Sequence, residues 1–375
     1  MPKIFNKQID REMDYPYEAS PPKRQVAYIF DTNKCIACQT CTIACKTCWT
    51  SGRGQEHIFY NNVETKPYGS YPMGWDTKLQ EQRVQVTWNN KRLESPTIFE
   101  GNSPNSPPDG WRPTSEDYAH PNHGEDDISG IIEKTAHFAG EHPMWMFYLA
   151  RICNHCTTPA CLAACPRKAI YKREEDGIVL VDQERCRGYQ ECVRACPYKK
   201  VFYNAVSRAS EKCIGCFPRV EQGLQALCVE GCIGKIRMHG FISTQTPPRE
   251  DNPLDYIIHI RRLALPLYPQ FGTGPNVYYV PPIHVPIGFC EQLFGPGVEE
   301  SVSLYRKLKD DPKLLGALFL FGSTDHIIEH FEVKDQVAIG WNAKGDEVSR
   351  VPFTEYTYVR PHHDKEFQVY RHNTA

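Results

Sequence analysis

Residues 151–200, RICNHCTTPACLAACPRKAIYKREEDGIVLVDQERCRGYQECVRACPYKK, contain two runs of closely spaced cysteines joined by a short polar stretch. Each run ends in a cysteine followed by proline, and in the second run Tyr189 stands where a further cysteine would complete the spacing. Between the runs, the pair Asp176-Gly177 suits a tight turn between two strand-like segments, because glycine tolerates positive φ. The stretch therefore predicts two cysteine loops joined by a β-hairpin.

Two more cysteine runs flank this stretch, CIACQTCTIAC at 35–45 and CIGCFPRVEQGLQALCVEGC at 213–232. Three thiolates of a C-x2-C-x2-C loop can bind one [4Fe–4S] cluster, while the next cysteine binds the other cluster of a pair, as in two-cluster ferredoxins. Proline after this last cysteine stops the helix from continuing. The four groups are Cys35, Cys38, Cys41 and Cys45; Cys153, Cys156, Cys161 and Cys165; Cys186, Cys192 and Cys196 with Tyr189; and Cys213, Cys216, Cys228 and Cys232.

In a pair of groups, the last cysteine of each group binds the cluster held by the other group, and this exchange assigns the cysteines to clusters. The second and third groups are adjacent, so they pair with each other and leave the first group to pair with the fourth. One cluster is then left with three thiolates, which suits a trinuclear [3Fe–4S] cluster of higher potential than its neighbours. We expect [4Fe–4S] clusters on Cys35, Cys38, Cys41 and Cys232, on Cys45, Cys213, Cys216 and Cys228, and on Cys153, Cys156, Cys161 and Cys196, and a [3Fe–4S] cluster on Cys165, Cys186 and Cys192 with Tyr189 as a non-ligand at its vacant corner.

Other interpretations of the 17 cysteines are weaker. An odd number, clustered at spacings of two and three, does not favour disulfides. Zinc also uses C-x2-C pairs, but it usually takes two well-separated pairs instead of three cysteines in a row, so zinc is the competing metal. Cys48 and Cys290 are left over and are interpreted as ordinary small residues. His155, inside CNHC, either donates a hydrogen bond to its cluster or is held by the backbone.

This arrangement predicts an α+β fold of two interleaved ferredoxin-like modules with a long insertion and a C-terminal extension. The insertion holds a strand-like segment at 83–88 and a polar loop at 101–127, and the extension holds a proline- and aromatic-rich segment at 261–282 and a hairpin at 337–351. We expect the polar loop and the proline-rich segment to contact partners. The expected units are an N-terminal partner-binding extension at 1–25, the split first module at 26–50 plus 205–245, the insertion at 51–144, the second module at 145–204 and a C-terminal partner-binding extension at 246–375.

Composition and charge disfavour several classes of function. The 375-residue chain has a formal net charge of −2 at pH 7, which does not indicate nucleic-acid binding. Its longest apolar run, LLGALFLF at 314–321, is too short to cross a bilayer, so we expect it to reach a membrane only through partners. Residues 1–20 lack the pattern of an export signal. No nucleophile–base pair or phosphate-binding loop stands out, so we expect no catalytic residue.

Taken together, these motifs resemble the iron–sulfur β subunits of the nitrate reductase-like (type II DMSO reductase) molybdoenzymes. The resemblance runs from about Val26 to Pro282 and is carried by the cysteine groups, NNVETKPYGSYP at 61–72 and ALPLYPQFGTGPNVYYVPP at 264–282. The N-terminal YPYE and residues 61–72 are most similar to nitrite oxidoreductase β subunits. Some of those carry aspartate at the position of Cys45, so nitrate, selenate, (per)chlorate reductases and ethylbenzene-type dehydrogenases stay open as alternatives.

The resemblance implies an electron-transfer subunit in an αβγ complex. Electrons would pass between a molybdenum–bis-MGD α subunit, beside the Cys35 group, and a haem b γ subunit or cytochrome acceptor, beside the trinuclear cluster. A Tat-signalled α partner would carry the chain to the periplasm or an equivalent lumen such as the anammoxosome, where it would be membrane-associated; the cytoplasmic face is the alternative. A free-standing polyferredoxin is the rival of a different class, although such a shuttle does not need the insertion and the long tail.

Overall fold

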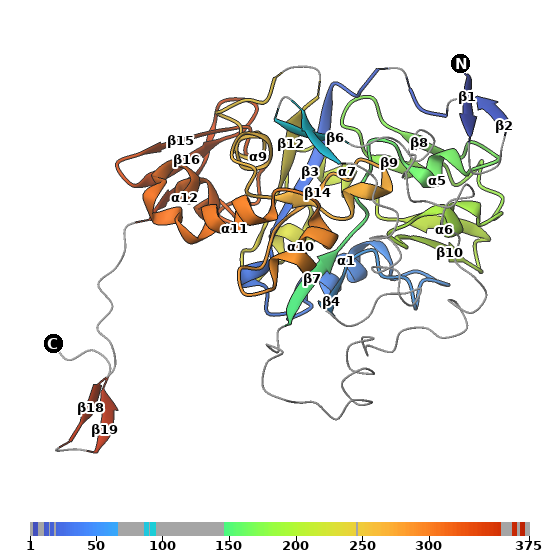
Figure 1. Cartoon of the computed structure of the whole chain (residues 1–375). Helices are drawn as coiled ribbons and strands as arrows, with labels where there is room; N and C mark the ends of the chain where they lie inside the picture. The colour runs from blue at the N-terminus through green and yellow to red at the C-terminus, as the bar shows by residue number, and fades with distance from the viewer. Residues whose placement is uncertain are drawn as a thin grey trace, which may run out of the picture.

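The computed structural model describes residues 3–6, 11–14, 16–18, 20–66, 86–89, 91–94, 146–244, 247–353, 362–365 and 368–371. The polar loop expected at 101–127 lies outside the described residues, and of the strand expected at 83–88 only the end is described, in β5 (Thr87–Asn89). The described residues combine helices and strands, as expected for an α+β protein. Figure 1 shows residues 298–341 on one side of a central sheet and residues 160–204 on the other.

The central sheet has four strands in the order β12-β3-β14-β13. β3 (Arg24–Asp31) runs antiparallel to β12 (Arg237–Ser243) and parallel to β14 (Val277–Val280), which pairs with the short β13 (Leu265–Pro266). Residues 261–282, predicted to contact a partner, are instead mostly buried and supply β13 and β14. The proline- and aromatic-rich segment thus belongs to the core of this chain.

Strand β3 is buried from Gln25 to Asp31 because both faces of the sheet are covered. Successive side chains of a strand point to opposite faces. Val26, Tyr28 and Phe30 accordingly pack into a core that includes many cysteines, whereas Ala27 and Ile29 pack into a second core with residues 314–321. The sheet therefore lies between two cores, and buried residues of the segment 285–302 belong to the core that contains the cysteines.

The cysteine-rich half is built from short helices and two-stranded hairpins. The hairpin expected at Asp176-Gly177 is present: β8 (Ile170–Lys172) pairs with β9 (Val179–Val181), and Gly177 has φ +70°. β10 (Val201–Asn204) pairs with β11 (Ala209–Lys212), and β4 (Asn62–Lys66) pairs with β7 (Phe147–Arg151). Helix α1 (Thr40–Trp49) packs on α8 (Leu227–Glu230), and α5 (Ala160–Ala163) packs on α6 (Glu191–Ala195).

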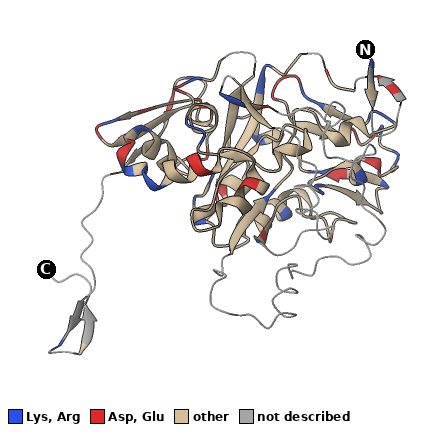
Figure 2. Ribbon diagram, viewed as in Figure 1, with Lys and Arg blue, Asp and Glu red and all other residues tan. Residues whose placement is uncertain are grey.

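The C-terminal layer contains α10 (Ile287–Phe294), α11 (Val298–Arg306) and α12 (Pro312–Phe319), followed by a sheet of β15 (His330–Lys334), β16 (Val337–Trp341) and β17 (Glu347–Pro352). The hairpin expected at 337–351 is formed by β16 and β17, with the Asn342 N–H donating to the Asp346 carbonyl at 3.0 Å. No described helix is long and apolar enough to cross a membrane. Figure 2 shows basic and acidic residues interspersed along the ribbon of the described elements.

The remaining elements are short. They are β1 (Lys3–Asn6), β2 (Arg11–Asp14), η1 (Thr32–Lys34), β6 (Arg92–Glu94), α7 (Phe217–Val220), α9 (Pro253–Asp255), η2 (Tyr256–Ile260), η3 (Pro269–Phe271), η4 (Leu308–Asp310), β18 (His362–Asp364) and β19 (Val369–Arg371).

Candidate metal centres

The first cysteine cavity, site 1, lies beside the loop between η1 and α1. Ala37 and Gln39 in this loop have φ of +53° and +59°, so the chain reverses direction between successive cysteines. Cys232 reaches the same cavity from the end of α8, almost 200 residues later in the chain. The four cysteines that line site 1 are Cys35, Cys38, Cys41 and Cys232.

The second cavity, site 2, lies between α1, α8 and the central sheet. Aromatic side chains of Tyr28, Trp49 and Tyr60 form part of its wall. Burial raises the pKa of the Cys228 thiol to about 12, although the nearby Arg237 guanidinium opposes this shift. The cysteines that line site 2 are Cys45, Cys213, Cys216 and Cys228.

The third cavity, site 3, is lined by His155 and Lys212 as well as by cysteines. The C-terminal segment holds its loop in place, because Asn276 Nδ2 donates to the His155 carbonyl at 3.0 Å and the Thr157 N–H donates to the Gly274 carbonyl at 2.7 Å. The cysteines that line site 3 are Cys153, Cys156, Cys161 and Cys196.

Three further cysteines, here called site 4, are Cys186 and Cys192, which contact Ser210, and Cys165, whose charge acts on Cys192. The Ser210 N–H donates to Cys186 Sγ at 3.3 Å, and the Cys192 thiol lies 3.3 Å from Ser210 Oγ. Burial raises the pKa of Cys192, and the charges of Cys165 and Cys186 add to this shift. Cys192 is buried and Cys165 and Cys186 are partly exposed, whereas Tyr189, the residue predicted at the vacant corner, is 58% exposed.

The donors around these cysteines fit a negatively charged, sulfur-rich group. Backbone N–H groups of Lys200, Gly215 and Ala169 donate to the sulfurs of Cys196, Cys213 and Cys165, at 3.5, 3.4 and 3.2 Å. Such bonds favour the thiolate over the thiol. Because buried thiols with raised pKa values lose their protons when they bind metal, donors and cations nearby stabilise the metal-bound form.

Two buried donors also lack a partner within the described residues. His155 Nδ1 accepts from the Val179 N–H at 3.1 Å, and burial together with Lys212 and Lys172 keeps the pKa of this ring well below its usual range. The neutral ring therefore carries its proton on Nε2, and no described residue accepts a hydrogen bond from this N–H. The second donor is Nε of Arg237, which also lacks an acceptor among the described residues. No three Cys, His, Asp or Glu side chains of the described chain converge as ligands of a single metal ion would; the cysteines line cavity walls.

The chain is similar to known proteins over most of its length. A family model described as a 4Fe–4S dicluster domain matches residues 144–242. The chain is 44% identical over 314 residues to the selenate reductase subunit beta of Thauera selenatis, an alignment that covers 75% of this chain and 90% of the relative. It is 42% identical over 315 residues to the chlorate reductase subunit beta of Ideonella dechloratans, again with 75% and 90% covered. The chain belongs to the iron–sulfur β subunits of the nitrate reductase-like molybdoenzymes.

Members of this family are the non-catalytic electron-transfer subunits of oxidoreductase complexes, and this β subunit is one of them. The respiratory nitrate reductase 1 beta chain of Escherichia coli (strain K12) is a more distant relative, 32% identical over 356 residues with 70% of each chain covered. The resemblance expected from the motifs is confirmed, and so is a ferredoxin-like 4Fe–4S domain. The interleaving of two modules stays a prediction.

Sequence reasoning missed buried cations at the cysteine cavities of this β subunit. Lys200 and Lys212 line site 3 and Arg237 lines site 1, and burial lowers the pKa of Lys200 to about 7. Lys212 directly precedes Cys213, and this neighbourhood in the sequence could have indicated a cation beside a cysteine site. Arg237 has no such signal, because only the pairing of β12 with β3 brings it to the cysteines.

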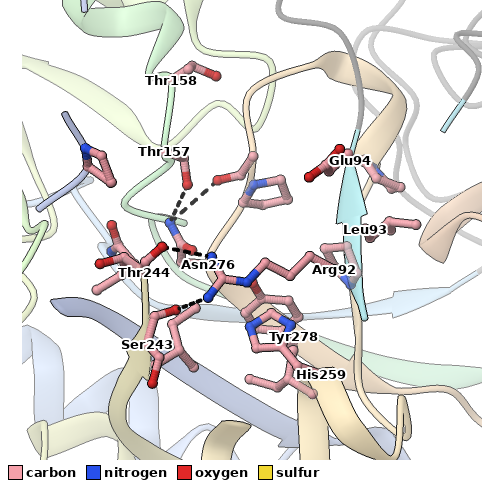
Figure 3. Close-up of a pocket in the computed structure, with 18 of the residues that line it drawn as sticks. Arg92, Leu93, Glu94, Thr157, Thr158, Ser243, Thr244, His259, Asn276 and Tyr278 are labelled. Carbon is pink, nitrogen blue, oxygen red and sulfur yellow. Dashed lines mark hydrogen bonds between the residues drawn. The ribbon is translucent and has the colours of Figure 1, made fainter. Parts of the chain in front are cut away.

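Neither spare cysteine lines sites 1 to 3. Cys48 is exposed on α1, and Cys290 is fully buried in α10, where burial raises its pKa to about 12. A further cavity of about 380 Å³ lies at β6 and the end of β12 and is lined by no described cysteine (Figure 3). There Arg92 donates to the carbonyls of Ser243 and Thr244 at 2.7 and 3.0 Å, which joins β6 to β12.

Gly188, which precedes Tyr189 at site 4, has φ +68°, and a Cβ atom there would lie 2.6 Å from the Arg208 carbonyl oxygen. We expect Gly188→Ala to lower the free energy of unfolding by about 1–3 kcal/mol, because it combines an unfavourable φ with a backbone clash. Gly345→Ala is the matched control, since Gly345 has φ +87° but no atom within 4 Å of the added Cβ. Thermal unfolding of both variants measures the difference between their losses of stability. Equal losses would show that the Arg208 carbonyl moves to accommodate the added methyl group.

Proposed function

We propose that this β subunit carries three [4Fe–4S] clusters and one [3Fe–4S] cluster. The observation that carries the proposal is the gathering of cysteines from distant segments around three cavities, together with the three cysteines of site 4. The clusters, when bound, take up and release single electrons. Proposed ligands are Cys35, Cys38, Cys41 and Cys232 in site 1, Cys45, Cys213, Cys216 and Cys228 in site 2, Cys153, Cys156, Cys161 and Cys196 in site 3, and Cys165, Cys186 and Cys192 in site 4.

Two interleaved ferredoxin-like modules are part of this proposal. The packing of α1 on α8 and of α5 on α6 supports it, because each pair joins cysteine groups that would exchange ligands. Residues 26–50 with 205–245 would form one module, and residues 145–204 the other. The extensions at 1–25 and 246–375 and the insertion at 51–144 would contact partners, although part of the C-terminal extension also completes the central sheet.

The clusters would relay electrons between a molybdenum–bis-MGD α subunit and a haem b γ subunit or cytochrome acceptor. Relatives named as beta subunits of selenate, chlorate and nitrate reductases support an α partner. We propose nitrite oxidoreductase as the complex, on the resemblance of residues 15–18 and 61–72; a related reductase or dehydrogenase is the alternative. The complex would be membrane-associated through its partners, in the periplasm or an equivalent lumen.

Metal analysis of the purified native protein tests the clusters. We expect about fifteen irons per chain with matching acid-labile sulfide, because three cubanes and one trinuclear cluster contain that number. EPR spectra of the oxidised protein should include the signal of a trinuclear cluster. Stoichiometric zinc without sulfide would contradict the proposal and favour tetrahedral zinc sites.

Replacement of Tyr189 tests the trinuclear site. We expect Tyr189→Cys to supply a fourth thiolate to site 4, to convert the trinuclear cluster to a cubane and to add about one iron per chain. Tyr171→Cys is the matched control, because Tyr171 is also an exposed tyrosine but belongs to the β8–β9 hairpin. An unchanged trinuclear signal in Tyr189→Cys would exclude this position as the vacant corner.

The native mass distinguishes a complex from a free-standing polyferredoxin. We expect the subunit to elute well above the 43.0 kDa of the single chain and to bring stoichiometric molybdenum with it. The expectation follows from the family and from the expected insertion and tail, which a soluble shuttle does not need. Elution of the native protein as an iron-loaded monomer without molybdenum would reject the complex and leave the polyferredoxin.

A further inference from the structure

Two buried cations, Arg237 and Lys212, lie between neighbouring cysteine cavities. Arg237 begins β12, lines site 1 and is only 1% exposed. Lys212 ends β11, lines site 3 and is only 2% exposed. A buried charge is strongly unfavourable unless anionic groups compensate it. The surroundings of these two side chains therefore indicate where negative charge is expected.

Arg237 contacts the walls of sites 1 and 2. Its Nη2 lies 2.9 Å from Sγ of Cys41 in site 1, and its Nη1 donates to Oδ1 of Asn61 at 3.2 Å, in the wall of site 2. The guanidinium carbon also lies 4.4 Å from the ring centroid of Phe30. Burial lowers the pKa of Arg237, but cysteines of both sites, Cys228 first, raise it more. The charges that stabilise this guanidinium are therefore those of cysteines.

Lys212 has the same relation to sites 2 and 3. Its Nζ donates to the carbonyl of Cys213, a site 2 cysteine, at 2.8 Å and to the carbonyl of Val179 in the wall of site 3. Burial lowers the pKa of Lys212, but Cys153 and Cys161 of site 3 and Cys213 of site 2 raise it more. Each cation is thus shared by two cavities, and site 2 has one on either side.

We propose that Arg237 and Lys212 are shared electrostatic bridges, with Arg237 raising the reduction potentials of the clusters in sites 1 and 2 and Lys212 raising those in sites 2 and 3. The proposal rests on the proposed function, since it takes clusters to occupy these cavities. Each reduction adds one electron from a neighbouring centre and transfers no atom. A fixed positive charge in a poorly screened interior favours the more negative, reduced form.

The test is an EPR-monitored redox titration that compares three iron-loaded proteins: the wild type, the Arg237→Met variant and the Lys212→Met variant. Each variant should lower two of the four potentials, and the two affected pairs should share one member, the cluster of site 2. We expect the equilibrium constant for reduction of each affected cluster to fall at least tenfold, which corresponds to 59 mV for a one-electron couple. This overlap can be recognised without assigning every signal beforehand.

Controls separate charge from packing. Arg92→Met removes an arginine that binds the far end of β12 through the Ser243 and Thr244 carbonyls, and it should leave all four potentials unchanged. Arg237→Lys and Lys212→Arg keep the charge and should restore most of each shift. If a methionine variant does not retain iron, Arg237→Gln and Lys212→Gln have the same expected effect, because they also remove the charge.

Iron content distinguishes the two possible failures. Loaded variants whose potentials do not move, or in which all four move equally, would overturn the bridging role while leaving the proposed clusters intact. Wild-type protein without iron would instead reject the proposed function. Two results together would establish the two bridges. The methionine variants should affect two pairs of clusters that share site 2, and the charge-retaining variants should restore the reduction potentials.

Discussion

The burial of many thiolates in a small volume is the constraint on which the rest of this structure depends. A thiol taken out of water resists ionisation, as the raised pKa values of Cys192 and Cys228 show. Metal-bound thiolates therefore need positive charge and hydrogen-bond donors close to them. Arg237, Lys212 and backbone N–H groups meet this need from within the fold, and the two cations have no carboxylate partner among the described residues. The net charge near zero therefore does not reveal that positive charges inside the protein are placed beside the cysteines.

Strand β3 connects the cysteine-rich core to a second hydrophobic core. Its alternate residues pack either with the cysteine loops, α10 and α11 or with α12, so one strand anchors both cores. β12 and β14 on either side of it come from far along the chain, and each contributes to a cysteine site. β12 brings Arg237 to sites 1 and 2, and the segment before β14 holds the loop of site 3 through Asn276. Short helices and loops are thereby positioned by a rigid sheet.

Sequence patterns were most informative where a motif is local. Cysteine spacing grouped the four sets and singled out Tyr189, and Asp176-Gly177 located a hairpin that the structure contains. Patterns of composition were less informative. The proline- and aromatic-rich segment at 261–282 suggested an external surface, yet it lies in the central sheet, because composition does not distinguish a partner surface from a buried strand. Residues such as Arg237, which act only through contacts across strands, left no local pattern.

By itself, the sequence determined the kind of protein this is. Thiolates that hold one cluster must come largely from one tight loop, so the spacing of Cys35 to Cys45 and of Cys153 to Cys165 carries the chemistry in a few residues. Only the tertiary structure decided which cations stand between the cavities and which segment completes the sheet. Those choices depend on the pairing of β3 with β12 and β14, over about 210 and 250 residues of sequence. Contacts at such separations arise from packing of the whole chain, and no short motif encodes them.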